Sequence, residues 1–266
     1  MSLFYQQLMP KDMQSRAEPG VVVLLHGLFG MSDNLLGLAK ALQAGFRIII
    51  PDLINHGHSP HRASMTYPEM AGDVIALLDS LNIQRFAVFG HSMGGKVAMQ
   101  LASDFPLRVT QLVVADIAPV SYPPHHQAIL QAMLVVDDAR IRQRSEADTL
   151  LAQAGIVPNL RQFFMKNMKR HGEYWVWRFG LHEIAAAYAD IAAAPVLKAG
   201  FAGAVLFIKG ELSDYIQPQH QAVIQQYFPQ AQFKIIQGAG HWLHAEKPNA
   251  FNRLVEKFLE VSHVQN

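Results

Sequence analysis

The segment FGHSMGG at residues 89–95 places one serine between two glycines, directly after the apolar run Phe86–Phe89. The spacing Gly-x-Ser-x-Gly between a strand and a helix is typical of a nucleophile elbow, a sharp turn that lifts the serine hydroxyl above a sheet edge. Gly90 and Gly94 fit this turn because the serine backbone is strained there and the helix packs close to the strand. The same short pattern also occurs in flexible turns. A role for Ser92 as a nucleophile therefore requires a general base and oxyanion donors elsewhere in the chain.

A serine nucleophile requires a general base, and a histidine on a loop after the last predicted strand would supply it. The segment QGAGHWLHAEKPNAF at residues 237–251 contains His241 and His244 in that place. We expect His241 to be the base, because Gly238 and Gly240 leave it on a loop tip. His244 falls where the next helical turn begins.

Acyl transfer also requires hydrogen-bond donors for the developing oxyanion, and one of them should come from a loop after an earlier strand. The segment LLHGLFG at residues 24–30 is such a loop. We expect the backbone N–H of Leu28 to pair with that of Met93, with Gly27 letting the loop pass close to the serine. The alternative is an ordinary glycine-rich exit from a strand.

Short apolar runs bounded by Gly, Asp or Pro predict strands that are buried on both faces, as in a parallel sheet. Stretches with helical spacing separate them, so the pattern indicates an α/β fold with a mostly parallel central sheet flanked by helices. The predicted strands are 21–25, 46–50, 86–89, 112–115, 205–208 and 233–236.

Residues 120–203 interrupt this alternation with Ala-, Gln- and Met-rich helical sequence that contains no convincing strand. We therefore predict a core of residues 1–119 and 204–266 and a helical cap at 120–203 that folds over Ser92. The aromatic residues of the cap could line an apolar acyl pocket or simply form the core of the cap itself. The residues that we expect to contact substrate are Phe29, Trp175, Trp177 and Trp242.

Three motifs in order, HGLFG, GHSMGG and GAGHW, resemble the α/β-hydrolase fold superfamily over nearly the whole chain. The segments DNLLGLAKAL, PDLINHGHSP and VVADIAPVSY are more narrowly similar to the bacterial YbfF-type esterases, relatives of the abhydrolase-11 group. The resemblance implies an α/β-hydrolase fold with a helical cap inserted after strand six, and ester hydrolysis that needs no cofactor.

The acid that orients the histidine has two candidates in the sequence. Many hydrolases of this superfamily carry it after the seventh strand, where FIKGELSDYIQP offers Glu211 and Asp214, but Asp214 lies four residues past Gly210 instead of the usual three. Asp116, directly after the preceding strand, is the competitor. The shared D-I-A-P segment implies that Asp116 does this work, and Asp214 remains the alternative.

Composition excludes several other classes of protein. The chain has 266 residues, a formal net charge of +1 and 16% charged residues, which gives no reason to expect a nucleic-acid partner. It has no cysteine and no H-E-x-x-H motif, so we expect no disulfide and no metal site. No apolar stretch is long enough to span a membrane, and the first residues do not resemble a secretory signal. We expect a cytoplasmic protein, and the sequence leaves its oligomeric state open.

We therefore expect a serine esterase or thioesterase that forms an acyl-enzyme with a small-molecule acyl ester or acyl-CoA. A carbon–carbon bond hydrolase or a MenH-like lyase could use the same triad, because a fold does not fix the chemistry. A ligand receptor without activity is a more remote alternative. Dehalogenases and epoxide hydrolases need an aspartate in place of Ser92. Asp52, Asn55 and His56, in a turn-forming segment, are assigned a structural role.

Overall fold

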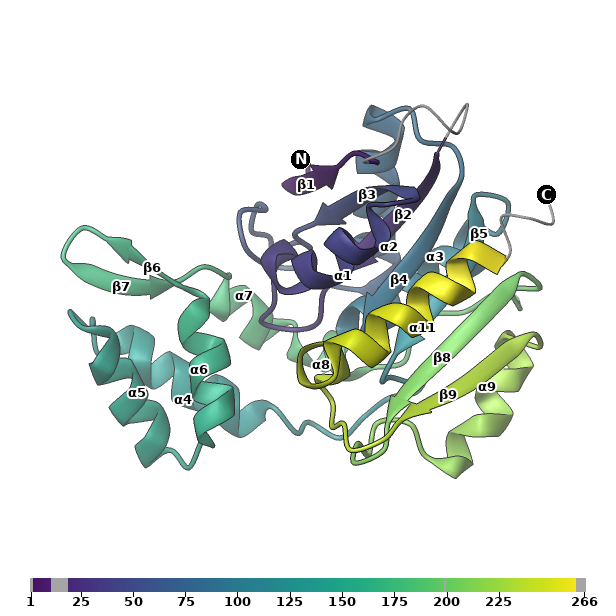
Figure 1. Ribbon diagram of the computed structural model, residues 1–266. Coiled ribbons are helices and arrows are strands. Elements are labelled where there is room, and N and C mark those ends of the chain that lie inside the picture. The colour runs from purple at the N-terminus through teal and green to yellow at the C-terminus, as the bar shows by residue number, and fades with distance from the viewer. Residues whose placement is uncertain (1, 11–18, 199, 262–266) are drawn as a thin grey trace.

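The computed structural model describes residues 2–10, 19–198 and 200–261 (Figure 1). Part of the N-terminal segment inspected for a secretory signal, residues 1 and 11–18, lies outside the described residues. The strands are β1 (Tyr5–Leu8), β2 (Gly20–Leu25), β3 (Phe46–Pro51), β4 (Phe86–His91), β5 (Val109–Ala115), β6 (Met168–His171), β7 (Tyr174–Trp177), β8 (Ala204–Gly210) and β9 (Ala231–Ile236). The α-helices are α1 (Leu36–Leu42), α2 (Tyr67–Ser80), α3 (Met93–Asp104), α4 (Gln127–Asp138), α5 (Arg144–Gln153), α6 (Pro158–Lys166), α7 (Leu181–Ala186), α8 (Tyr188–Ala192), α9 (Gln221–Tyr227), α10 (Leu243–Glu246) and α11 (Pro248–Val261), with short 3₁₀ turns at Ser32–Leu35 and Pro218–His220.

The central sheet has seven strands in the order β1-β3-β2-β4-β5-β8-β9. All neighbouring pairs are parallel except β1 and β3, so the predicted mostly parallel α/β sheet is confirmed. The edge strand β1 was not predicted, because its sequence YQQL is polar and only partly buried. Since the other six strands run in the same direction, the loops after them meet at one edge of the sheet.

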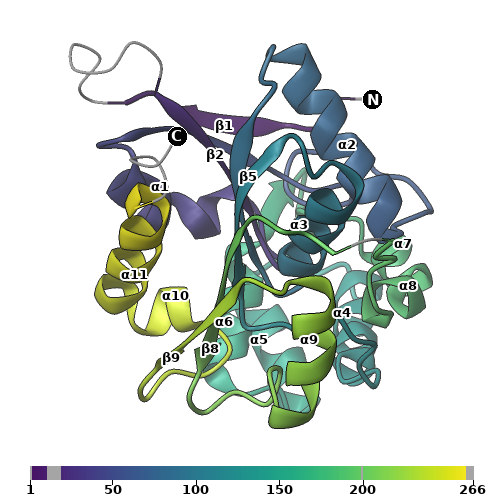
Figure 2. The same ribbon diagram turned by 90° about the vertical axis from the view of Figure 1, so that its right-hand side faces the viewer.

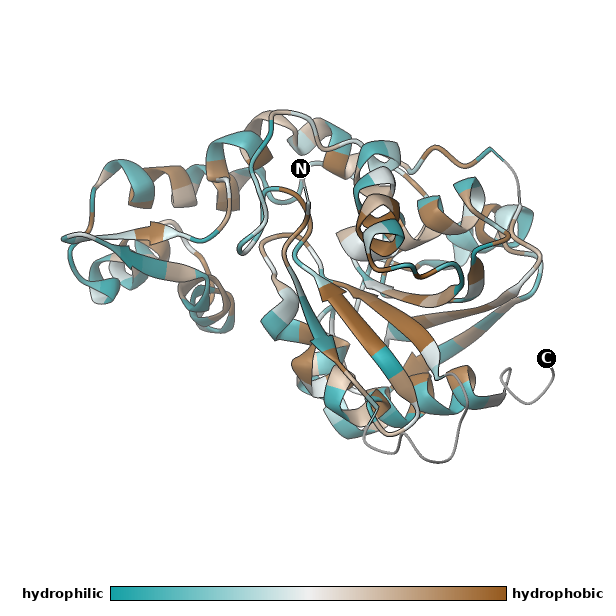
Figure 3. Ribbon diagram, turned by 90° about the horizontal axis from the view of Figure 1, so that it is seen from above, coloured by the Kyte–Doolittle hydropathy of each residue, from teal (hydrophilic) through white to brown (hydrophobic). Residues whose placement is uncertain are grey.

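Helices cover both faces of the sheet, as Figure 2 shows with the sheet seen nearly edge-on. Helices α1, α10 and α11 lie on one face, and α2, α3 and α9 lie on the other. Successive side chains of β2 pack on opposite faces of the sheet: Val22 belongs to one apolar cluster and Val23 to the other. Burial on both faces explains why the inner strands β2 and β4 are continuous apolar runs. Figure 3 shows several strands of the sheet mostly in brown.

The chain between β5 and β8 forms helices α4 to α8 and extends beyond one end of the sheet (Figure 1). The expectation that this insertion contains no strand is wrong, because β6 and β7 pair as an antiparallel hairpin. The hairpin escaped prediction because each strand has only four residues and β6 carries Lys169, Arg170 and His171 on an exposed surface. The insertion also leaves the sheet after the fifth strand of the described chain, and not after a sixth.

The buried side chains of the insertion and of the α2–α3 layer form one continuous apolar cluster. Leu130, Phe164 and Ile184 of the insertion belong to the same cluster as Val97 of α3. Among the described residues, no helix combines the length and the apolar character that a membrane crossing requires.

Candidate active site

Ser92 occupies the sharp turn between β4 and α3, with φ 53° and ψ −120°. This is a strained conformation for a residue with a side chain. The flanking glycines make the turn possible: a Cβ on Gly90 would lie 2.1 Å from the carbonyl oxygen of Gly94, and one on Gly94 would lie 2.4 Å from that of Leu25. The turn therefore presents the Ser92 side chain at the carboxyl edge of the sheet.

The structure brings Ser92, His241 and Asp116 into one chain of hydrogen bonds. The Ser92 hydroxyl lies 3.0 Å from His241 Nε2, and His241 Nδ1 lies 2.7 Å from Asp116 Oδ2. Because a carboxylate can only accept, Nδ1 carries the imidazole proton and Nε2 accepts from the serine. These are the orientations that a serine hydrolase requires of its base.

Asp116 is fully buried at the end of β5. Its Oδ1 accepts a hydrogen bond of 3.0 Å from the backbone N–H of Gly210, and its Oδ2 accepts one from the Ser213 hydroxyl. Asp214 is exposed and accepts from Gln217 Nε2 at 3.0 Å. The chain after β8 thus brings Ser213 to the buried carboxylate, and the alternative acid Asp214 has no hydrogen bond to His241.

His91 is a site residue that the sequence analysis missed. Its ring lies between those of His241 and His244, with centroid distances of 4.8 and 4.6 Å, and its Nε2–H donates to the His241 backbone carbonyl at 2.8 Å. Burial, with His244 and His241 close by, holds the pKa of His91 well below its usual value, so the ring is neutral. The one available signal was a polar residue at the end of a buried strand.

Leu28 and Met93, whose backbone N–H groups are the expected oxyanion donors, line the same cavity as Ser92. Met93 is the first residue of α3, and its N–H belongs to the donors that a helix leaves unsatisfied at its start. Within the described part of the chain, neither N–H has a hydrogen-bond acceptor. Both lie beside Ser92 on the wall of a cavity. Two free donors next to a hydroxyl can stabilise an oxyanion.

Two buried histidines hold the loop that carries Leu28. His56 Nε2 accepts from the Phe29 N–H at 3.2 Å, and His26 Nε2 accepts from the Leu53 N–H at 3.0 Å. Burial lowers the pKa of His26 to about 4 and, together with the nearby His26, that of His56 to about 3. Both rings are therefore neutral acceptors near pH 7.

The segment Asp52–His56 has the structural role that its sequence predicted. Asp52 is fully buried and accepts from the backbone N–H groups of Ser32 and His58. Asn55 is also fully buried, and its side chain bonds both backbone groups of Arg62. The Asp52–Ser32 contact links the loop after β3 to the segment after β2, and the other contacts hold the loop after β3 together.

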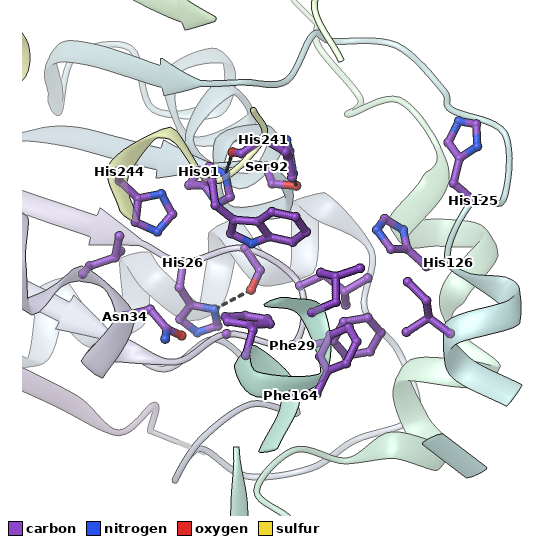
Figure 4. Close-up of a pocket in the computed structure, with 18 residues that line it drawn as sticks. His26, Phe29, Asn34, His91, Ser92, His125, His126, Phe164, His241 and His244 are labelled. Carbon is purple, nitrogen blue, oxygen red and sulfur yellow. Dashed lines mark hydrogen bonds between the residues drawn. The ribbon is translucent and has the colours of Figure 1, made fainter. Parts of the chain in front are cut away.

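A cavity of about 160 Å³, which we call the main pocket, opens beside Ser92 and His241 (Figure 4). Phe29 and Trp242, two of the residues expected to contact substrate, lie on its walls. Side chains of the insertion complete the wall: His125, His126, Ile129, Leu160, Phe163 and Phe164. The pocket therefore lies between the sheet edge and the insertion, and its walls combine apolar side chains with six histidines, Asn34 and Ser92.

The structure does not support the substrate contacts expected of Trp175 and Trp177, because neither lines the main pocket. Trp177 is buried inside the insertion, where its Nε1–H donates to the Met133 carbonyl and its ring stacks on Phe179. Trp175 lies under the guanidinium of Arg144. Both rings belong to the packing of the insertion, the alternative that the sequence left open.

His126 is a second site residue that the sequence analysis missed. Its backbone N–H donates to the Tyr188 hydroxyl at 2.9 Å, and that hydroxyl lies 3.1 Å from His126 Nδ1. Burial lowers the pKa of His126 to about 4. His126 lies in the insertion predicted at 120–203, and no local pattern marks a histidine that lines a pocket together with residues of the sheet edge.

The described residues hold no group of three or more His, Asp or Glu side chains arranged to bind a metal ion.

Comparison with known proteins identifies the family of the chain. Residues 20–248 match the family model described as alpha/beta hydrolase fold. The "sn-1-specific diacylglycerol lipase ABHD11" of Mus musculus is 38% identical over 246 residues, covering 90% of this chain and 80% of that protein. "Esterase YbfF" of Escherichia coli strain K12 is 37% identical over 247 residues, covering 92% of this chain and 95% of that protein.

A solved structure described as "Marine microorganism esterase" superposes with a TM-score of 0.90 at 33% identity, covering 97% of this chain and 99% of that one. The resemblance to the YbfF-type esterases is thereby confirmed. With its parallel sheet, its elbow and these relatives, the chain belongs to the α/β-hydrolase fold family.

Proposed function

We propose that this protein is a serine hydrolase that cleaves carboxylic esters or acyl thioesters through an acyl-enzyme. The observation that carries the proposal is the continuous chain of hydrogen bonds from Ser92 through His241 to Asp116, with distances of 3.0 and 2.7 Å. Ester hydrolysis is further supported by the esterase and lipase names of the relatives.

In the proposed reaction, Ser92 Oγ attacks the acyl carbon while His241 Nε2 takes the hydroxyl proton. The N–H groups of Leu28 and Met93 stabilise the oxyanion, and the buried Asp116 carboxylate stabilises the imidazolium. The imidazolium then protonates the leaving alcohol or thiol. A water molecule, activated by the same imidazole, releases the acid and restores Ser92.

We further propose that residues 120–203 act as a cap over the core formed by 1–119 and 204–266. The walls that the insertion gives to the main pocket, Phe163 and Leu160 among them, support this role. The apolar side chains that the insertion adds suit the hydrocarbon part of a substrate.

The test is hydrolysis of p-nitrophenyl esters and acyl-CoAs of graded length by the wild-type protein and by Ser92→Ala. The expected result is turnover of at least one series and a loss of about 10⁴-fold or more in the variant. Ser80→Ala, at the exposed end of α2, is the matched control and should retain full activity. Turnover by Ser92→Ala at the wild-type rate would refute the proposal. If the wild-type protein cleaved a carbon–carbon bond of a diketone but none of the esters, the alternative chemistry would be favoured.

A further inference from the structure

A second, smaller cavity also adjoins Ser92. This inner pocket has a volume of about 40 Å³, and the residues that line it include Tyr67, Met93, Lys96, Ile117, Tyr122 and Ile191. It shares walls with the main pocket at Leu28, Ser92, His125 and His126. An ester bound at Ser92 thus has two compartments available, one for each side of its scissile bond.

The position of His241 distinguishes the two compartments. His241 lines the main pocket but is absent from the walls of the inner pocket. Because its imidazolium must protonate the leaving oxygen, the alcohol has to lie on the His241 side. A third hollow, near Asp214, also touches His241, but Ser92 is not on its wall. The acyl chain is then left with the inner pocket, next to the Met93 N–H.

The volumes of the two pockets set different limits on what they hold. An engineered apolar cavity of about 150 Å³ binds benzene, so the main pocket of about 160 Å³ suits a group of that size. A cavity of about 40 Å³ offers room for roughly two or three water-sized groups. The acyl side of the substrate must therefore be the short one.

Several polar atoms around the inner pocket already have partners in the protein. The Tyr67 hydroxyl donates to the Ile191 carbonyl at 2.5 Å, and the Tyr122 hydroxyl donates to the Tyr215 carbonyl at 2.5 Å. Lys96 Nζ donates to the carbonyls of Ala192 and Ala193 at 3.1 and 2.5 Å. A polar acyl substituent would lose its hydration without gaining these groups as partners, which favours a plain hydrocarbon chain.

We propose that the enzyme prefers esters of short saturated acids, with about two or three carbons, joined to a larger apolar alcohol that occupies the main pocket. This inference rests on the proposed function. The bond from Ser92 Oγ to the acyl carbon forms as the bond from that carbon to the alcohol oxygen breaks. The serine proton moves through His241 to the departing oxygen, so no other reactant is needed before water releases the acid.

The first test compares two series of esters on the wild-type protein. Across p-nitrophenyl acetate, butyrate and octanoate, kcat/KM is expected to fall by about tenfold or more, because each methylene that fails to fit is worth at least that factor. Across ethyl, butyl and benzyl acetate, kcat/KM is expected to rise. An octanoate that reacts as fast as the acetate would overturn the inference, while Ser92-dependent cleavage of that octanoate would leave the proposed function intact.

The second test changes one wall of each pocket. Ile191→Ala, at the end of α8, enlarges the inner pocket and should raise the ratio of kcat/KM for butyrate over acetate by about tenfold. Ile129→Ala, in α4, enlarges only the main pocket and should leave that ratio unchanged while altering the preference among alcohols. Because both readouts are ratios, partial loss of folded protein does not affect them. A butyrate-to-acetate ratio that responds to Ile129→Ala and not to Ile191→Ala would reverse the assignment of the two pockets.

Discussion

The loops at the carboxyl edge of the sheet and the insertion at 120–203 contribute to the same pocket in different ways. Four residues other than glycine at that edge have positive φ: Phe29, Asn55, Ser92 and Asp116. The only such residue of the insertion, within its described part, is Arg140. Strained backbone persists only where the surroundings determine it strongly, and it concentrates at functional sites.

The difference indicates that the sheet edge holds its loops in fixed positions, whereas the insertion shapes the wall of the pocket. At the sheet edge, buried side chains such as Asp52, His26 and His56 bond to the backbone of neighbouring loops and fix the positions of the reacting atoms. In the insertion, aromatic rings such as Phe163 and Phe164 pack on each other and shape the wall of the pocket. Substitutions at the edge should therefore change kcat, and substitutions in the insertion should change substrate preference.

After Ser92→Ala, the largest effect is expected from Asp116→Asn, which should lower kcat on an ester by about 10³ to 10⁴-fold. The amide would donate to His241 Nδ1 and hold the imidazole in the wrong tautomer. Steady-state kinetics measure this loss, and Asp214→Asn is the matched control. The opposite pattern, with Asp214→Asn as the damaging change, would move the acid to the loop after β8.

The buried histidines of the edge should make the protein sensitive to acid. Burial lowers the pKa of His26 from 6.5 to about 4. Between pH 6.5 and pH 4, His26 is therefore protonated in the unfolded chain and neutral in the folded chain. Stability therefore falls as the pH drops through this window, by about 3 kcal/mol for this residue alone.

Urea unfolding at pH 7 and pH 4.5 checks this in the wild-type protein and in His26→Gln. Glutamine can donate to the Gly27 carbonyl and accept from the Leu53 N–H as His26 does. The variant should lose less stability between the two pH values than the wild type. An equal loss in both would show that His26 does not resist protonation.

A smaller effect is expected from His91→Phe, which keeps a ring between His241 and His244 but removes the donor to the His241 carbonyl. We expect kcat to fall by about tenfold with little change in KM, because His241 would be less well oriented toward Ser92. His91→Gln, whose amide can donate, should recover part of the loss. Equal kcat for the phenylalanine and glutamine variants would exclude this positioning role.

The smallest effect is expected in the insertion. Phe163→Ala removes a wall of the main pocket and should raise KM several-fold for an ester of a large apolar alcohol, with kcat nearly unchanged. Trp175→Ala, outside the pocket, should leave KM as it is. A larger change of KM in the Trp175 variant would mean that the wall of the pocket has been assigned to the wrong ring.

Sequence patterns predicted the features that depend on local spacing. The alternation of apolar runs predicted six of the seven strands of the sheet, and Ser92 and His241 come from short motifs with glycines at defined offsets. Asp116 needed the resemblance to related esterases, because its partner lies 125 residues away. Ser213 has no local signal, and His91 has only its place at the end of a buried strand, since their contacts form only when distant strand ends meet.

The aromatic residues of the insertion were the least predictable part of the site. Trp175 and Trp177 are aromatic residues in a segment with basic neighbours, as residues on a pocket wall could be. Both nevertheless pack inside the insertion. Phe163 and Phe164, a few residues earlier, face the cavity instead. Trp175 and Trp177 lie on the short hairpin β6–β7, whose exposed charged residues gave no strand pattern, so the sequence did not show which rings line the pocket.

The central claim is that Ser92 is a nucleophile activated by His241, and covalent labelling tests it most directly. After incubation with a fluorophosphonate, intact-mass and peptide analysis should find one adduct per chain, on the peptide that contains Ser92, and none in Ser92→Ala. A wild-type protein that stays unlabelled, or a Ser92→Ala variant that gains the same adduct, would contradict the account.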